Sequence, residues 1–124
     1  VGRYKANRDP YPVVALTADS AVLTCIGNDF GYDEIFSRQV KALGHEGDVF
    51  IGLSTSGTSS NILKAVDQAK MAGMTVIALT GAKGTLKDKA DYVIAAPAES
   101  TARRQELHLH AIHLLCEFFE PAAA

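Results

Sequence analysis

The feature of this sequence that most constrains its fold is the alternation of short apolar runs with longer segments of helical periodicity. The apolar runs are rich in β-branched residues and occupy residues 13–16, 48–53, 74–79 and 92–96. Between and after these runs, apolar residues recur every three or four positions, which is the spacing of an amphipathic helix. Runs that are so continuously apolar are typical of parallel strands covered on both faces. The pattern therefore predicts an α/β fold with a parallel sheet between layers of helices.

Length, composition and charge indicate one globular domain without a preference for polyanions. The chain has 124 residues, 48% of them hydrophobic and 21% charged, and we expect residues 1–124 to form a single domain. The net charge of −2 disfavours a nucleic-acid partner. The sequence shows no membrane-spanning run and no signal-peptide pattern, so we expect a cytoplasmic protein without a membrane partner. Because it begins at Val1 rather than at a methionine, we expect it to be part of a longer protein.

The strongest local signal is the hydroxyl-rich loop at residues 54–60, which joins the second predicted strand to a helix. Its sequence, Ser-Thr-Ser-Gly-Thr-Ser-Ser, places hydroxyls and free backbone N–H groups at the positive end of the helix dipole. The loop lacks the lysine of the P-loop and the glycine spacing of dinucleotide-binding loops, which favours a small phosphate monoester over a nucleotide. Serine and threonine also cap helices that bind no ligand, so this simpler interpretation stays open.

Two further pairs of polar residues could contribute to a site. Asn28 and Asp29 lie in what we interpret as a turn after the first strand, where turn formation alone would explain them. Gln105 and His113 lie on or beside an apolar face of the helix predicted over residues 101–120. They are about 12 Å apart along the helix axis, so they could share a ligand only by reaching toward each other.

The helix predicted over residues 101–120 is apolar on two opposite sides. One side carries Leu107, Ala111, Leu114, Leu115 and Phe118, and the other carries Leu109, Ile112 and Cys116 beside Gln105. We therefore expect one side to pack on the sheet and the other on a second subunit or another part of the protein. The histidines at 108, 110 and 113 do not provide the i, i+4 pair that predicts a metal site, and single helical histidines are more often packed or solvated.

Three segments together resemble the sugar isomerase (SIS) domain of bacterial phosphoheptose isomerases. They are residues 27–31 (Gly-Asn-Asp-Phe-Gly), residues 54–59, and residues 105–108 (Gln-Glu-Leu-His) followed by His113. The resemblance extends over residues 1–120 and implies a three-layer α/β/α fold of the flavodoxin-like or Rossmann-like kind. It also implies a zinc-dependent homotetramer that interconverts sedoheptulose 7-phosphate and D-glycero-D-manno-heptose 7-phosphate, toward the heptose of lipopolysaccharide.

The same resemblance implies a role for each matching residue. Four residues of the loop would bind the sugar phosphate: Ser54, Thr55, Ser56 and Ser59. Asn28 and Asp29 would contact the substrate, and Gln105 would bind both substrate and zinc. His113 would be a zinc ligand and would transfer a proton during the aldose–ketose interconversion, a task that suits the near-neutral pKa of an unperturbed histidine.

The sequence departs from the family in two respects. The family's other two zinc ligands, a histidine and a glutamate that is also the catalytic base, precede the stretch that matches Arg3 and Tyr4, and we expect them in a missing N-terminal segment. Arg104 replaces an aliphatic residue of the family, and we expect its guanidinium to reach water or an acidic partner. Two alternatives stay open: a non-catalytic SIS protein that binds a replication initiator, and a regulatory domain that binds a sugar phosphate.

Overall fold

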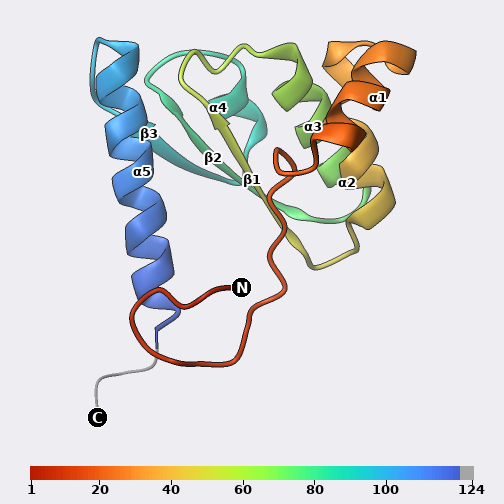
Figure 1. Cartoon of the computed structure of the whole chain (residues 1–124). Helices are drawn as coiled ribbons and strands as arrows, with labels where there is room; N and C mark the ends of the chain where they lie inside the picture. The colour runs from red at the N-terminus through yellow and green to blue at the C-terminus, as the bar shows by residue number, and fades with distance from the viewer. Residues whose placement is uncertain (121–124) are drawn as a thin grey trace.

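The computed structural model describes residues 1–120 and has a three-stranded parallel sheet at its centre (Figure 1). The strands are β1 (Val49–Ser54), β2 (Thr75–Gly81) and β3 (Tyr92–Ala96), and they lie side by side in that order. In the register of the sheet, Ile51 is opposite Ile77, and Leu79 is opposite Ile94. All three strands coincide, within one or two residues at each end, with the predicted apolar runs.

The helices lie on both sides of this sheet, which confirms the predicted α/β class. They are α1 (Ser20–Phe30), the 3-10 helix η1 (Tyr32–Glu34), α2 (Ser37–Leu43), α3 (Ser60–Met71), α4 (Leu86–Lys89) and α5 (Thr101–Phe118). Figure 1 shows α1, α2 and α3 together on one side of the sheet and α5 alone on the other. No helix among residues 1–120 is long and apolar enough to cross a membrane.

The hydrophobic core lies between α3 and the sheet. Ala65, Val66 and Ala69 of α3 are completely buried, as are Val76 and Ala78 of β2. Small and β-branched side chains at these positions let the helix lie close to the strand. This packing fixes the N-terminus of α3 beside the C-terminal end of β1, where the hydroxyl-rich loop joins them.

The strand predicted at residues 13–16 is wrong. This segment is an irregular stretch before α1, and Val13 and Val14 are 66% and 68% exposed. A strand needs hydrogen-bonded neighbours, and the sheet of the described residues ends at β1. Pro10 and Pro12 favour extended backbone and also remove two donors, so the chain before this apolar run can be extended without joining the sheet.

The turn predicted around Asn28 and Asp29 is also wrong. Both residues lie in the last turn of α1, which continues to Phe30 and ends at Gly31. Gly31 has φ of 90°, a conformation that glycine adopts without a steric penalty. The helix propensities of two short polar residues do not determine whether they continue a helix or form a turn. Here they continue the helix that the preceding residues of α1 form.

The expectation that both faces of every strand are covered holds only in part. Along β1, buried and exposed residues alternate, and Val49, Ile51 and Leu53 are 53%, 41% and 42% exposed. These side chains face away from α3, and α5 packs on β2 and β3 instead. On α5 itself, Leu109 and Leu114 also remain more than half exposed.

Candidate functional site

The hydroxyl-rich loop lies at the C-terminal edge of the sheet, where open α/β folds bind their ligands. Ser54 ends β1, and Ser59 is the extended residue that precedes the first turn of α3. Between them, Gly57 has φ of 70° and lets the chain turn sharply. The loop therefore places several hydroxyls beside the positive end of the α3 dipole, as the sequence predicts.

The serine hydroxyls of the loop contact one another rather than cap the helix. Ser54 Oγ lies 3.0 Å from Ser59 Oγ and 3.5 Å from Ser56 Oγ. Ser59 makes no side-chain hydrogen bond to the N–H groups of α3. Ser59 therefore does not cap α3 through its side chain, and the loop leaves these hydroxyls beside the helix N-terminus.

The loop that follows β2 holds the hydroxyl-rich loop in place. The N–H of Leu86 donates to the carbonyl of Gly57 at 2.9 Å, and the N–H of Gly57 donates to the carbonyl of Ser54 at 3.1 Å. A Cβ on Gly57 would lie 2.7 Å from the carbonyl oxygen of Lys83 and 2.9 Å from Thr80 Oγ1. Glycine is thus required at position 57 by both its backbone angle and its surroundings.

We expect Gly57→Ala to destabilise the fold by about 2 kcal/mol or more, because an L-residue pays for the left-handed backbone and also displaces the Lys83 carbonyl. Chemical denaturation monitored by circular dichroism measures the change. Gly27→Ala is the matched control, since a Cβ there sits in a helix and meets only Ile35 at 3.9 Å. Equal stability of the two variants would contradict the prediction.

A cavity of about 440 Å³ adjoins the loop and extends toward α5. Its lining residues come from the end of β1, the loop and one face of α5: Leu53, Ser54, Thr55, Ser59, Gln105, His108, Leu109 and Ile112. Gln105, whose role in a site the family resemblance implies, therefore lines the same cavity as residues of the hydroxyl-rich loop. The cavity combines hydroxyl and amide groups at one end with an apolar wall at the other.

His108 is the one polar lining residue of this cavity to which the sequence assigns no role. Its side chain is almost completely buried, at 4% exposure, and Nε2 lies 3.2 Å from the carbonyl oxygen of Thr80. A carbonyl only accepts, so Nε2 carries the proton, and in the neutral ring Nδ1 is then an acceptor. The signal was present in the spacing, since Gln105, His108, Leu109 and Ile112 follow the i, i+3, i+4, i+7 pattern of one helix face.

The other predicted site residues lie outside this cavity. Asn28 and Asp29 are exposed on α1, where Asn28 Nδ2 donates to Asp29 Oδ1 at 2.8 Å. His113 is exposed two turns beyond Gln105 on α5, with its ring 6.0 Å from the ring of Tyr4. The structure thus unites the loop with Gln105 but does not bring Asn28, Asp29 or His113 to the same cavity.

Arg104 has no acidic partner among residues 1–120, and its guanidinium binds two backbone carbonyls instead. Its Nε donates to the carbonyl of Ala98 at 2.7 Å, and a second guanidinium nitrogen donates to the carbonyl of Thr55 at 3.1 Å. Both acceptors are backbone groups of loops at the C-terminal edge of the sheet. The neighbouring Gln105 still lines the cavity, so the arginine does not turn it away from the loop.

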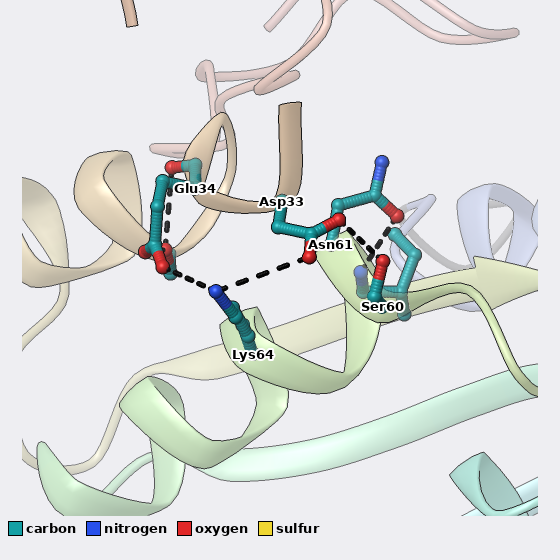
Figure 2. Close-up of polar contacts among 7 residues, drawn as sticks. Asp33, Glu34, Ser60, Asn61 and Lys64 are labelled. Carbon is teal, nitrogen blue, oxygen red and sulfur yellow. Dashed lines mark hydrogen bonds and ion pairs between the residues drawn. The ribbon is translucent and has the colours of Figure 1, made fainter. Parts of the chain in front are cut away.

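A polar network ties η1 to the first two turns of α3, next to the loop (Figure 2). Ser60 donates to Asp33, and Lys64 donates to Glu34 at 2.6 Å. The hydrogen bond from Lys64, with a second from Ser37, lowers the pKa of Glu34 below its ordinary 4.5. The same contact with Glu34 raises the pKa of Lys64. The network anchors the start of α3 to the segment that follows α1.

We expect Glu34→Gln to flatten the acid side of the stability profile. Because the pKa of Glu34 is lowered in the folded protein, its contribution is complete above its ordinary pKa and is lost as the pH falls through the lowered value. Unfolding by urea at pH 7 and pH 3 measures this difference. Glu46→Gln, in the turn before β1, is the control. An unchanged pH dependence in Glu34→Gln would contradict the assignment.

The residues described do not complete a metal site. Among residues 1–120 there is no group of three or more His, Cys, Asp or Glu side chains that could hold a metal ion. Gln105 and His113 would supply two ligands of the four that zinc usually takes. A zinc site on these two residues would thus need further ligands from elsewhere.

Comparisons with known proteins agree with this architecture. The family model described as SIS domain matches residues 1–81. The chain is 51% identical over 121 residues to the phosphoheptose isomerase of Thermodesulfovibrio yellowstonii, covering 97% of this chain and 60% of the relative. It is 46% identical to the phosphoheptose isomerase of Akkermansia muciniphila, covering 97% of this chain and 64% of the relative.

Two solved structures share the fold over most of the chain. A phosphoheptose isomerase from Francisella tularensis has a TM-score of 0.89 and 41% identity, covering 94% of this chain and 63% of that one. The enzyme from Neisseria gonorrhoeae has a TM-score of 0.84 and 47% identity, covering 86% and 61%. The chain spans about three fifths of the length of the curated relatives it matches. By the match of its first 81 residues and by its architecture, the chain belongs to the SIS domain family.

Proposed function

We propose that this chain belongs to a phosphoheptose isomerase, which interconverts sedoheptulose 7-phosphate and D-glycero-D-manno-heptose 7-phosphate. The observation that carries the proposal is the cluster of Ser54, Ser56 and Ser59 hydroxyls at the N-terminus of α3, in one cavity with Gln105. High identity to phosphoheptose isomerases supports the same reaction. We further propose that the product is used to make the heptose of lipopolysaccharide. We also propose that the enzyme is located in the cytoplasm.

The phosphate group is the part of the substrate that the loop would bind. Ser54 Oγ lies within hydrogen-bond distance of the Ser56 and Ser59 hydroxyls, and each of the three can rotate to donate to a phosphate oxygen instead. Thr55 borders the same cavity, and the N-terminus of α3 favours negative charge. Hydroxyls and backbone dipoles without a lysine fit a small phosphate monoester.

The sugar would extend from the loop along α5. Gln105 can bind hydroxyl or carbonyl groups of the sugar, and Leu109 and Ile112 form an apolar wall of the cavity. In a 7-phosphate, the reacting carbons 1 and 2 lie at the end opposite the phosphate, so the acid–base residue must lie away from the serines. His113, two turns beyond Gln105, fits this requirement and is our proposed proton donor, while Asn28 and Asp29 are proposed substrate contacts.

Zinc and a homotetrameric assembly are further parts of the proposal. Gln105 and His113 would be zinc ligands, and the remaining ligands would come from outside the described residues. The exposed apolar side chains of β1 and α5, such as Leu53 and Leu109, support assembly because large apolar surfaces usually face a partner.

The proposal is tested by incubating the chain with sedoheptulose 7-phosphate and zinc in D₂O. Aldoheptose formation and deuterium uptake at carbon 2 or carbon 1 report the isomerisation. A chimera that adds the remaining part of the Thermodesulfovibrio yellowstonii relative is assayed in parallel, because this chain spans 60% of that protein. Turnover by either protein supports the isomerase; binding of the sugar phosphate without turnover by either would favour the non-catalytic SIS protein.

A further inference from the structure

We propose that Arg104 is a positioning residue for phosphate: it fixes the Thr55–Ser56 peptide and places an unpaired positive charge beside the hydroxyl-rich loop. The inference rests on the proposed function only in taking a phosphate as the ligand. Arg104 lies outside the serine cluster. Its guanidinium would supply a positive charge, which no residue of the loop itself carries.

The Arg104 guanidinium bridges the segments that follow β1 and β3, and it lies beside the end of β2. It donates to the carbonyl of Thr55, which follows β1, and to the carbonyl of Ala98, which follows β3. At the end of β2, a Cβ on Gly81 would lie 3.2 Å from Arg104 Nε, so the absence of a side chain there makes room for the guanidinium. A planar group with several donors in fixed directions suits this arrangement better than an ammonium group does.

The hydrogen bond to Thr55 determines the orientation of the next N–H group. In a trans peptide the carbonyl and the N–H point in opposite directions, so a Thr55 carbonyl held by Arg104 directs the Ser56 N–H away from the guanidinium. If this peptide rotated by about half a turn, the Thr55 carbonyl oxygen would take the place of the Ser56 N–H. Its partial negative charge would then repel an anion on that side of the loop. The hydrogen bond from Arg104 to the Thr55 carbonyl opposes such a rotation of the Thr55–Ser56 peptide.

Arg104 also carries a positive charge without a carboxylate partner in the described part of the chain. None of the ion pairs within residues 1–120 involves it. Glu99 lines the same groove beside Thr55 and Ser56 but does not pair with the guanidinium. The next residue on the helix gives a direct comparison, because Arg103 is bound by Glu106 at 2.7 Å and points to solvent.

The experiment compares Arg104→Met with Arg103→Met, which remove the same charge from adjacent positions of α5. Titration of the chain with inorganic phosphate, followed by calorimetry and by amide NMR spectra, gives the dissociation constant and the site. We expect Arg104→Met to weaken phosphate binding about tenfold and Arg103→Met to change it less than about twofold. The Ser56 amide resonance of the free protein should move in Arg104→Met only, which a general loss of stability would not produce.

Arg104→Lys keeps the inference testable if Arg104→Met does not fold. An ammonium group retains the charge but cannot reach both the Ala98 and Thr55 carbonyls in the same geometry, so we expect weaker phosphate binding than in the wild-type chain. Equal affinities of the Arg103 and Arg104 variants, an unmoved Ser56 resonance, or no phosphate binding by the wild-type chain would each overturn the inference. If phosphate binding depends on Arg104 while sedoheptulose 7-phosphate is never turned over, the inference stands and the proposed isomerase fails.

Discussion

Replacing Ser54 and Ser59 together by alanine should weaken binding of sedoheptulose 7-phosphate about 10²-fold to 10⁴-fold. Each hydroxyl would donate to a charged phosphate, and such hydrogen bonds contribute about 1.5–3 kcal/mol each, where about 1.4 kcal/mol corresponds to a factor of ten. The two oxygens lie 3.0 Å apart in the free protein, so they can bind the same phosphate group. Isothermal titration calorimetry with the sugar phosphate measures the loss.

Ser60→Ala is the matched control for this double variant. Ser60 is adjacent to Ser59, but its hydroxyl donates to Asp33 in the network that anchors α3 and does not join the serine cluster. We therefore expect Ser60→Ala to bind the sugar phosphate nearly as the wild-type chain does. Thermal melts of all three proteins separate lost binding from lost folding. A double variant with wild-type affinity would show that the serines only shape the loop.

The sequence predicts those parts of the fold in which the local pattern of apolar residues matches the burial and strand pairing of the folded protein. Strands β1, β2 and β3 are continuous apolar runs, and they form one parallel sheet. The apolar run at residues 13–16 looks the same in the sequence, but it has no neighbouring strand among the described residues. Whether a run becomes a strand depends on its partners, which a local pattern does not contain.

The same distinction applies to the site. The hydroxyl-rich loop was predictable because a strand, a glycine turn and a helix N-terminus are all encoded within residues 54–60. The burial of His108 was not, because it depends on the Thr80 carbonyl at the end of another strand. The two carbonyl partners of Arg104 could not be predicted either, because Thr55 is 49 residues away along the chain and Ala98 is 6 residues away in a different element. Tertiary contacts, rather than composition, decide these cases.

His113→Gln should lower the turnover of sedoheptulose 7-phosphate about 10²-fold to 10⁴-fold, which is the usual contribution of one acid–base side chain. Glutamine retains a polar group of similar size but cannot exchange a proton near neutral pH. Because His113 lies two turns from Gln105 and outside the loop cavity, inorganic phosphate should bind to the variant with an unchanged dissociation constant. The rate is measured in whichever protein turns over, the chain or the chimera.

His108 and His110 make this prediction specific. His110 is exposed on the same helix, so His110→Gln should be nearly as active as the unsubstituted protein. His108 lines the cavity with its Nε2 held by the Thr80 carbonyl, and His108→Gln should therefore affect the Michaelis constant more than the turnover number. A loss of turnover in His108→Gln with normal turnover in His113→Gln would reverse the assignment. The proton-transferring residue would then lie within the loop cavity, one turn beyond Gln105 instead of two.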